Sequence, residues 1–490
     1  MAKFARQTGK FYLASAIVAG CGLGCNGAAW AQLEEVVVTA QKRSENLQNV
    51  PIAITAFDAE AMEAKQITAV QDLRFTAPNV SYSKGNFTGS NFKIRGIGQD
   101  LVAATADAGV GIHINDVPLQ DPRLYETEYY DIEQLVVLRG PQGTLYGRNS
   151  TGGAVNMITN RAALDEMSGN IEGQYGNHDN VRLKGMINIP LGDTLAVRFA
   201  GISLQRDGYT RNLATGNDID DRDQWSLRGS LQWRPTDNTA INFMASYMDE
   251  NSSRTRSPKQ LCHNDPSGLL GCLPDKLAYD AVNPLAQLTG IIPSRLGPLG
   301  PQPGLTNDTA GVPRSLRKVA ADTDPDYQSD ETLAILRLEH QFTHHEMTII
   351  TSYHDTSLTS QQDYTMNSSE VEFFPSPLLE GLAPITYATY FADNQLPISR
   401  QSRTNTGLVG GNIGGRSNSL DGFDISSANT EQYTFEANLA SNYEGALNFM
   451  AGIFALDADV DNDYWVIANG LDYFSVVLPA VPLSLGGLIG

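Results

Sequence analysis

Residues 137–156 read VLRGPQGTLYGRNSTGGAVN, a run with five glycines: Gly140, Gly143, Gly147, Gly152 and Gly153. Glycine adopts positive φ angles and lets backbones approach closely, so the run predicts a tightly folded loop. Aliphatic residues on both sides predict strands over 135–138 and 154–158. A phosphate-binding loop does not fit, because residues 143–150 lack the lysine that such a loop needs.

The run belongs to a segment, residues 50–161, in which short strands accompany one helix. Further strands are expected over 92–95 and 110–114, with glycines between them. A helix is expected over 58–73, where apolar residues recur near one face: Met62, Ile67, Val70 and Leu73. The segment therefore predicts a compact α+β domain of about 110 residues.

From Ser168 onward the sequence alternates with a period of two. Between Trp225 and Trp233 every second residue is apolar or glycine, and the residues between them are polar. Nine or ten strands are expected, over 168–177, 179–190, 194–206, 223–234, 238–249, 330–340, 345–355, 430–441, 445–457 and 463–468.

Alternation of this kind fits a soluble sandwich as well as a membrane barrel. Three features favour the barrel. Tight turns near 192, 236, 343 and 443 alternate with connections of up to about 70 residues or more. The strands run to about 10 to 14 residues, enough to cross a bilayer when tilted. Aromatic residues gather near strand ends, as interfacial girdles require: Trp225, Trp233, Tyr247, Tyr353 and Tyr443.

The first 31 residues have the features of an export signal. Three cations precede an apolar stretch over 11–24, and Ala29-Trp30-Ala31 fits a cleavage site. A lipoprotein signal is the alternative, because Val18 to Cys21 resembles a lipobox. The apolar stretch is shorter than the ~20 residues of a spanning helix, and no later stretch has that length without charges.

The formal net charge of −21 argues against two classes of partner. A nucleic-acid-binding protein needs a basic face for the phosphates. A protein that docks onto anionic lipid needs one as well.

The cysteines and histidines leave two open choices. Cys21 and Cys25 fall within the signal, while Cys262 and Cys272 share one connection and are expected to form a disulfide in an oxidising compartment. The alternative is a metal pair with His263. Near residue 343 a cluster could suggest a metal site, but strand-end side chains at a membrane interface are the favoured interpretation: His340, His344, His345 and Glu346.

The segment that follows the signal is extended. Glu35, Val36, Val37, Val38, Thr39 and Ala40 contain three consecutive β-branched residues, which favour a strand. Residues 41–49 are polar, so no local partner is expected for that strand. An unpaired strand near a terminus fits a segment that a partner's sheet edge accepts. An ordinary first strand of the domain is the alternative.

Four motifs together resemble the TonB-dependent outer-membrane receptors. Residues 35–40 resemble the family's TonB box, and Arg95-Gly96 resembles its “I-R-G” signature. Asp116 and Pro118 lie in a segment similar to the “D-G-V-P” hairpin, with Asn115-Asp116 in place of Asp-Gly. The strongest match is to the family's plug end, through Arg139, Gly140, Gly143, Tyr146, Gly147, Arg148, Gly152, Gly153 and Asn156.

The resemblance implies an α+β plug followed by an antiparallel transmembrane β-barrel of 22 strands in the outer membrane of a Gram-negative bacterium. The expected domains are a signal (1–31), the TonB box and linker (32–49), the plug (50–161) and an N-terminal part of the barrel (168–490). Arg139 and Arg148 are expected to be cations in the lumen, held by carboxylates on barrel strands.

The resemblance also implies active import of a scarce ligand, most often a ferric siderophore or another iron complex. Cobalamin, nickel complexes and oligosaccharides are alternatives. The implied partners are the inner-membrane TonB protein, outer-membrane lipid and the small-molecule ligand. A passive porin or a binding-only surface receptor is the rival class, while a secreted enzyme is not indicated, since no catalytic constellation or cofactor site is evident.

The size of the barrel leads to a further expectation. Ten strands would enclose a radius of about 10 Å and 22 strands about 22 Å. A plug of about 110 residues has an outer radius near ~17 Å, which fits only the larger barrel. The sequence is therefore expected to be a C-terminally truncated fragment of its family's barrel.

Overall fold

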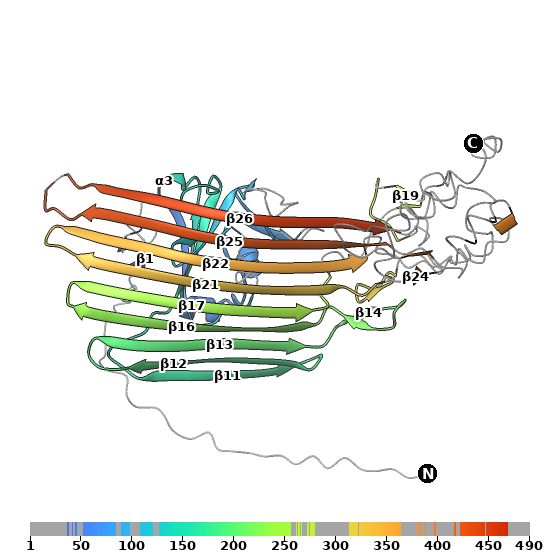
Figure 1. Ribbon diagram of the computed structural model, residues 1–490, viewed down its shortest axis with the longest axis horizontal. Helices are drawn as coiled ribbons and strands as arrows, with labels where there is room; N and C mark the ends of the chain where they lie inside the picture. The colour runs from blue at the N-terminus through green and yellow to red at the C-terminus, as the bar shows by residue number, and fades with distance from the viewer. Residues whose placement is uncertain are drawn as a thin grey trace, which may run out of the picture.

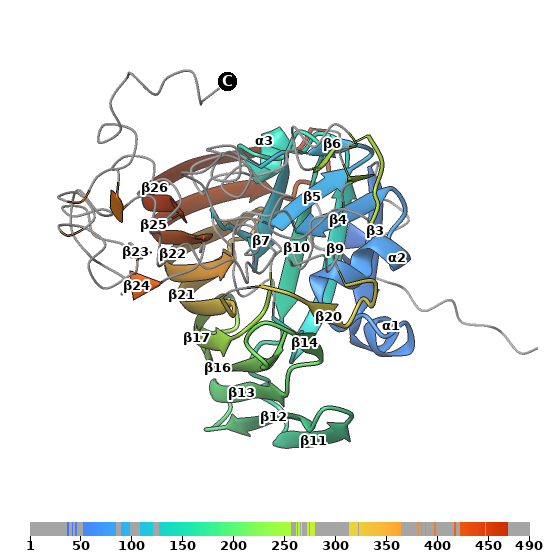
Figure 2. The ribbon, with the colours of Figure 1, turned by 90° about the vertical axis from the view of Figure 1, so that its right-hand side faces the viewer.

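The chain folds into a small mixed domain that lies against one face of a large antiparallel sheet (Figures 1 and 2). The computed structural model describes residues 52–84, 90–98, 108–120, 127–255, 313–321, 323–363, 422–445 and 447–468, with shorter pieces within 37–46, 261–279, 380–397 and 416–417. In these residues no helix is both long and apolar enough to cross a membrane.

The N-terminal domain is built on a five-stranded sheet in the order β3-β9-β10-β7-β8. Its strands are β3 (Ala53–Asp58), β9 (Ile132–Arg139), β10 (Gly153–Thr159), β7 (Val110–Ile114) and β8 (Val117–Pro118). β10 pairs in parallel with β7, and the other pairs are antiparallel. A second sheet contains β4 (Val80–Lys84), β5 (Ser90–Ile94) and β6 (Ile97–Gly98). The expected α+β domain is confirmed.

The single helix expected over 58–73 is wrong. The chain instead forms α1 (Ala59–Ala64), a 3-10 turn η2 (Val70–Asp72) and α2 (Leu73–Thr76). α1 ends because Gln66 takes a left-handed φ of 53°, and the Ile67 amide then donates to the Met62 carbonyl. Asp72 accepts 2.9 Å bonds from the amides of Thr68 and Ala69, which starts the second helical turn.

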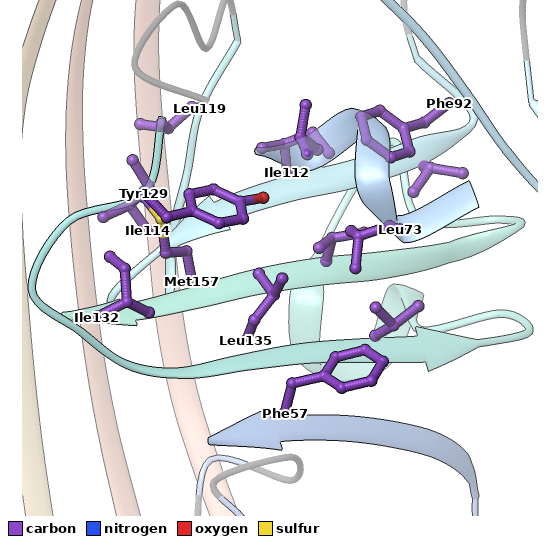
Figure 3. Packing of buried hydrophobic residues seen from close by; sticks show 14 of the residues in the cluster. Phe57, Leu73, Phe92, Ile112, Ile114, Leu119, Tyr129, Ile132, Leu135 and Met157 are labelled. Carbon is purple, nitrogen blue, oxygen red and sulfur yellow. The ribbon is translucent and has the colours of Figure 1, made fainter. Parts of the chain in front are cut away.

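The apolar core lies between these helical turns and the five-stranded sheet (Figure 3). Leu73 and Leu135 are fully buried there, and Phe57 packs with them. Burial of such side chains contributes about 1.5 to 3 kcal/mol each. The same core continues into the large sheet through side chains of three of its strands: Met244, Met248, Leu333, Ile335 and Ile350.

The large sheet contains nine antiparallel strands in sequence order. They are β11 (Ser168–Gly176), β12 (Asn180–Pro190), β13 (Leu195–Arg206), β16 (Arg222–Thr236), β17 (Thr239–Ser252), β21 (Asp326–Gln341), β22 (His345–Asp363), β25 (Gly422–Ser441) and β26 (Met450–Ala468). The last two expected strands are one strand, β26. The strands from β21 onward have 16 to 20 residues, longer than expected.

Short pieces complete the fold. Near the N-terminus β1 (Val37–Val38) pairs with β2 (Glu45–Asn46). One turn of helix, α3 (Gly143–Tyr146), lies between β9 and β10. Beyond the ends of the long strands are β14 (Thr210–Asn212), β15 (Asp218–Ile219), β18 (His263–Asn264), β19 (Cys272–Leu273), β20 (Lys318–Val319), β23 (Leu396–Pro397) and β24 (Arg416–Ser417).

The two ends of the large sheet differ. The connections at 191–194, 237–238, 342–344 and 442–449 lie together on one end, here called the turn rim (left in Figure 1). The connections after β13, β17 and β22 start from the other end, the loop rim. These four tight turns and three longer connections therefore lie at opposite ends of the sheet. The alternation is not strict, because the short β11–β12 turn at His178 also lies at the loop rim. There the His178 carbonyl accepts a 2.8 Å bond from the Asp207 backbone amide.

The face of the large sheet turned away from the N-terminal domain is apolar. Leu227 and Phe243 are exposed on it, and Trp225 contacts Tyr247 with ring centroids 5.4 Å apart. Trp225 and Trp233 lie about 26 Å apart along β16, or about 20 Å along the barrel axis at a ~40° tilt. This is close to the height of an apolar band that faces lipid between two aromatic girdles.

Candidate functional site

The glycine-rich run folds into the end of β9, α3 and the start of β10. Gly153 has a φ of 150°, and a Cβ there would lie 2.2 Å from the Leu138 carbonyl oxygen. No other residue fits this position without moving the β9–β10 ladder. Gly140 and Gly147 also have positive φ angles, and Gly143 begins α3.

The second motif packs against the first. Arg95 and Gly96 both have positive φ angles and form the turn between β5 and β6. A Cβ on Gly152 would lie 2.7 Å from the Ile97 carbonyl oxygen, and one on Gly140 would lie 3.4 Å from the Arg95 guanidinium. The two motifs, about 45 residues apart in sequence, therefore form one tightly packed unit.

The third motif departs from the family pattern, and its side chains compensate. Asn115 and Asp116 both have positive φ angles in the β7–β8 turn, where the family has a glycine. Asn115 Oδ1 accepts a 2.9 Å bond from the Thr159 amide, and Asp116 Oδ1 accepts a 2.7 Å bond from Asn156 Nδ2. Asparagine and aspartate tolerate this backbone region better than most side chains.

A buried polar network links the motifs. The His113 and Tyr146 rings meet edge to face at 5.0 Å, and Asn156 joins Tyr146 to Asp116. Burial and the nearby Lys42 cation lower the pKa of His113 to about 4. Burial alone would raise the pKa of Asp116, but Arg337 and Lys42 outweigh it and hold that pKa below its ordinary value.

Acidification from pH 6.5 to 4 should destabilise the N-terminal domain through His113. Its folded pKa lies below the unfolded value of 6.5, so stability present above pH 6.5 is lost as the pH falls toward 4. The difference corresponds to about 3 kcal/mol. The measurement is the denaturant midpoint of the whole chain in detergent against pH. His113→Gln should flatten this part of the curve, while the exposed His178→Gln should not; equal curves for all three proteins would contradict the assignment.

Arginines on the inner face of the large sheet hold the carboxylates of the domain. Arg337 of β21 pairs with Asp116 and donates a 3.1 Å bond to the Asn115 carbonyl. Arg198 of β13 donates a 2.8 Å bond from Nε to Asp131. These side chains are at most 13% exposed, so the pairs are shielded from water and each partner depends on the other.

Hydrogen bonds to neutral groups of the domain, its backbone carbonyls and amides, add to this attachment. Arg228 of β16 donates 2.7 and 2.9 Å bonds to the carbonyls of Tyr130 and Asp131. The side-chain amide of Gln432 in β25 makes two hydrogen bonds to the end of β8 and the residues that follow it. Its Nε2 donates to the Pro118 carbonyl at 2.7 Å, and its Oε1 accepts from the Gln120 amide at 3.0 Å. The domain is thereby fixed to strands from β13 to β25.

The expected pairing of Arg139 with a carboxylate of the large sheet is wrong. Arg139 donates a 3.5 Å bond to the Ile54 carbonyl of its own domain. Arg148 is exposed, and its pairing with a carboxylate of the sheet stays a prediction. Among the described residues, the sheet supplies most cations and the domain most carboxylates. Two ion pairs run the other way, Arg161 with Glu339 at 2.9 Å and Lys42 with Glu436.

The segment expected to have no local partner does have one. Val37 pairs with Asn46 and Val38 with Glu45 in a short antiparallel ladder. Lys42 between them has a left-handed φ of 56°, which lets the polar segment fold back. The Lys42 ammonium also lies 5.8 Å from the centre of the Tyr146 ring. Glu35, Val36, Thr39 and Ala40 lie outside the described residues.

The histidines near residue 343 contact aromatic rings at the turn rim. His345 Nε2 and the Tyr443 hydroxyl are 2.8 Å apart, and His340 packs on Phe342 at 4.3 Å. Within the described part of the chain, no three His, Cys, Asp or Glu side chains are placed to hold a metal. Cys262 and the signal, with Cys21 and Cys25, lie outside the described residues, so the disulfide with Cys272 stays a prediction.

Comparison with known proteins explains this arrangement. Residues 46–154 match the TonB-dependent Receptor Plug Domain family. The N-terminal domain matches this plug family, and it is called the plug below. The chain is 29% identical over 184 residues to the iron-regulated outer membrane virulence protein of Vibrio cholerae, over 36% of this chain and 28% of that protein. It is 30% identical over 190 residues to the pesticin receptor of Yersinia pestis, over 37% and 27%.

The large sheet shares the fold of these receptors as well. The pyoverdine outer membrane receptor FpvA from Pseudomonas aeruginosa PAO1 superposes with a TM-score of 0.55 and 12% identity, over 88% of this chain and 50% of that one. The chain therefore spans about half of that receptor, and its alignments cover less than a third of the curated relatives. The large sheet, called the wall below, corresponds to part of such a receptor's barrel. The barrel is not closed in the described residues.

Several residues of the site were not predicted from the sequence. They are Lys42, His113, Asp131, Arg198, Arg228, Arg337, Gln432 and Glu436. Of these arginines, the period-two pattern placed only Arg228 on the face opposite Trp225 and Trp233. It carried no signal for their partners in the plug, because residues such as Asp116 and Arg337 are 221 positions apart.

Proposed function

We propose that this chain is part of a TonB-dependent importer that moves a scarce ligand across the outer membrane. The observation that supports this most is a plug fixed by ion pairs and apolar contacts to the inner face of a lipid-facing wall. A plug in the lumen stops passive flow, so a porin has no use for it. Passage then requires that energy moves the plug.

The energy source proposed is the inner-membrane TonB protein, acting on the segment over 35–40. A partner that adds a strand to an exposed segment uses main-chain hydrogen bonds. Val37 and Val38 are already extended and paired in a two-residue ladder, which a longer pairing with a partner would replace. Lys42 ties the following residues to the wall through Glu436, so a pull on the segment is transmitted to the plug and wall.

The ligand proposed is a ferric siderophore or another iron complex. This proposal is supported by the similar proteins, which include an iron-regulated outer membrane protein and a pyoverdine receptor. The location proposed is the outer membrane, after removal of residues 1–31. The proposed domains remain the box and linker (32–49), the plug (50–161) and the wall (168–490).

The test is uptake by cells that express the complete gene, with a panel of labelled ligands. Uptake of an iron chelate should stop when the proton-motive force is collapsed or TonB is deleted, while binding at the cell surface continues. Uptake that continues under both conditions would show a passive pore instead. Energised uptake of cobalamin or an oligosaccharide alone would keep the mechanism and change the ligand.

A further inference from the structure

A small sheet at the loop rim joins two connections of the wall. Its strands β14 and β15 belong to residues 207–221, the connection after β13, whereas β20 lies in the connection after β17. The Arg211 amide donates to the Arg317 carbonyl at 3.0 Å, and the Leu213 amide donates to the Val319 carbonyl at 2.8 Å. β14 and β20 pair in parallel over only two residues, and so short a ladder is not stable without further contacts.

Asn212 and Asp324 supply those contacts. Asn212 is fully buried, and its Nδ2 donates to the Ala321 carbonyl at 2.9 Å and to Asp324 Oδ1 at 2.8 Å. Its Oδ1 accepts from the Ala321 amide at 3.1 Å. The Asp324 carboxylate also accepts from the Thr215 hydroxyl at 2.7 Å and from Asn217 Nδ2 at 2.6 Å. One carboxylate thus accepts three hydrogen bonds from the connection after β13, and bonds to an ionised acceptor are stronger than bonds between neutral groups.

The beginning of the connection after β17 is attached to the same residues. Asp220 Oδ1 accepts from the Thr255 amide at 3.0 Å and from the Thr255 hydroxyl at 2.7 Å. The Asp220 amide donates to the Ser253 carbonyl at 3.1 Å, and the Asp221 carboxylate accepts from the Ser253 amide. Both ends of the connection after β17 are therefore bonded to the connection after β13.

This assembly is also fixed to the wall. Arg206, at the end of β13, donates a 2.6 Å bond to the Asp220 carbonyl, and its guanidinium lies 4.6 Å from the centre of the Tyr209 ring. The Arg317 guanidinium lies 4.0 Å from the centre of the same ring. In Figure 2, β14 and β20 lie side by side on the inner side of the curved wall. The two connections and the wall are thus one bonded unit at the mouth of the lumen.

We propose that the connection after β13 is a brace that fixes both ends of the connection after β17 before the ligand arrives, and that Asp324 is its main positioning residue. A surface already held in its binding shape loses little conformational entropy when a ligand binds, so the brace raises affinity at the cell surface. The proposed energy coupling through residues 35–40 does not involve these contacts, so affinity and transport rate respond separately. This inference rests on the proposed import function and adds how the capturing surface is held.

The first test needs no ligand. In the whole chain in detergent, Asp324→Ala should speed hydrogen exchange of the Leu213 and Ala321 amides at least ~tenfold, while the amides of β17 exchange as before. Asp218→Ala is the matched control, because Asp218 lies in the same connection but is 57% exposed, and its 3.4 Å pair with Arg211 contributes little. It should leave exchange unchanged. Unchanged exchange in Asp324→Ala would overturn the brace.

The second test separates positioning from general damage. In cells that express the complete gene at equal receptor levels, Asp324→Ala should weaken surface binding of a labelled iron chelate at least ~tenfold. The maximal rate of energised uptake at saturating chelate should stay within about twofold of the wild type. Asp324→Asn keeps Oδ1 as an acceptor for Asn212 and Thr215, so it should bind nearly as well as the wild type.

Two outcomes of the second test overturn the proposal. One is normal affinity in Asp324→Ala. The other is an equal loss of affinity in Asp324→Ala and Asp324→Asn, because the charge of Asp324 would then act on the ligand itself and not through the brace. Absence of energised uptake in the wild type would instead count against the import function, and the exchange test would still decide whether the brace exists.

Discussion

Replacing Val37 by proline in the complete receptor should abolish energised uptake while ligand binding at the cell surface stays normal. Proline lacks the backbone N–H that a strand partner needs and fixes φ near −65°. Main-chain pairing tolerates a change of side chain, so Val37→Ala should reduce uptake only by about twofold or less. The measurement is uptake of labelled ligand over time, beside equilibrium binding to whole cells at low temperature.

The β1–β2 ladder requires a matched control, because Val37→Pro also breaks its pairing with Asn46. Glu45→Pro disrupts the same ladder from the opposite strand but leaves the N–H groups of residues 36–38 in place. It should therefore keep most of the uptake. If Val37→Pro cells import ligand at the normal rate, energy coupling through this segment is wrong. Loss with Glu45→Pro alone would mean that the hairpin, and not the partner strand, matters.

Replacing Arg337 by glutamine should loosen the plug from the wall. The Asp116 carboxylate is 6% exposed, and without the guanidinium it becomes a buried charge with weaker partners. Removal of one partner of such a pair costs about 3 to 5 kcal/mol, and the remaining contacts with Asn156 and Lys42 favour the lower end. The expected result is faster hydrogen exchange in residues 110–118 and a lower denaturant midpoint for the plug.

A double variant separates the ion pair from general damage. Asp116→Asn combined with Arg337→Gln removes both charges, so it should recover most of the stability that Arg337→Gln loses. Arg337→Lys keeps the charge but loses the fork in which Nη2 donates to Asp116 and the Asn115 carbonyl while Nη1 donates to Glu339. Its stability should lie between that of Arg337→Gln and that of the double variant. If the double variant is as unstable as Arg337→Gln, the pair does not explain the effect.

The features that were predicted correctly are those that a local stretch of chain determines. The glycines around Gly153 and the alternation between Trp225 and Trp233 each describe backbone geometry or one face of one strand. The helix over 58–73 was wrong because its apolar spacing continues past Gln66, where the backbone turns left-handed. The strand at Val37 was assigned no partner because a polar segment gives no apolar pattern that would predict its ladder.

The attachment of plug to wall could not be predicted for a different reason. Asp116 and Arg337 meet only after five strands of the wall, β11 to β17, have been placed between them. A sequence shows that an arginine faces inward, but not which carboxylate will lie opposite. Arg139 and Arg148 were the predicted cations because they belong to the glycine-rich motif, whereas the arginines that hold the plug are distributed over separate strands of the wall.

The continuous apolar core has a consequence for biogenesis. Plug residues such as Leu135 share a cluster with Leu333 and Ile350, which leave the ribosome about 200 residues later. Contacts between residues so far apart in sequence form slowly. Until they form, the early part of the chain exposes apolar side chains to solvent. The plug is therefore not a preformed domain that enters a completed barrel. Plug and wall are therefore expected to fold together and not one after the other.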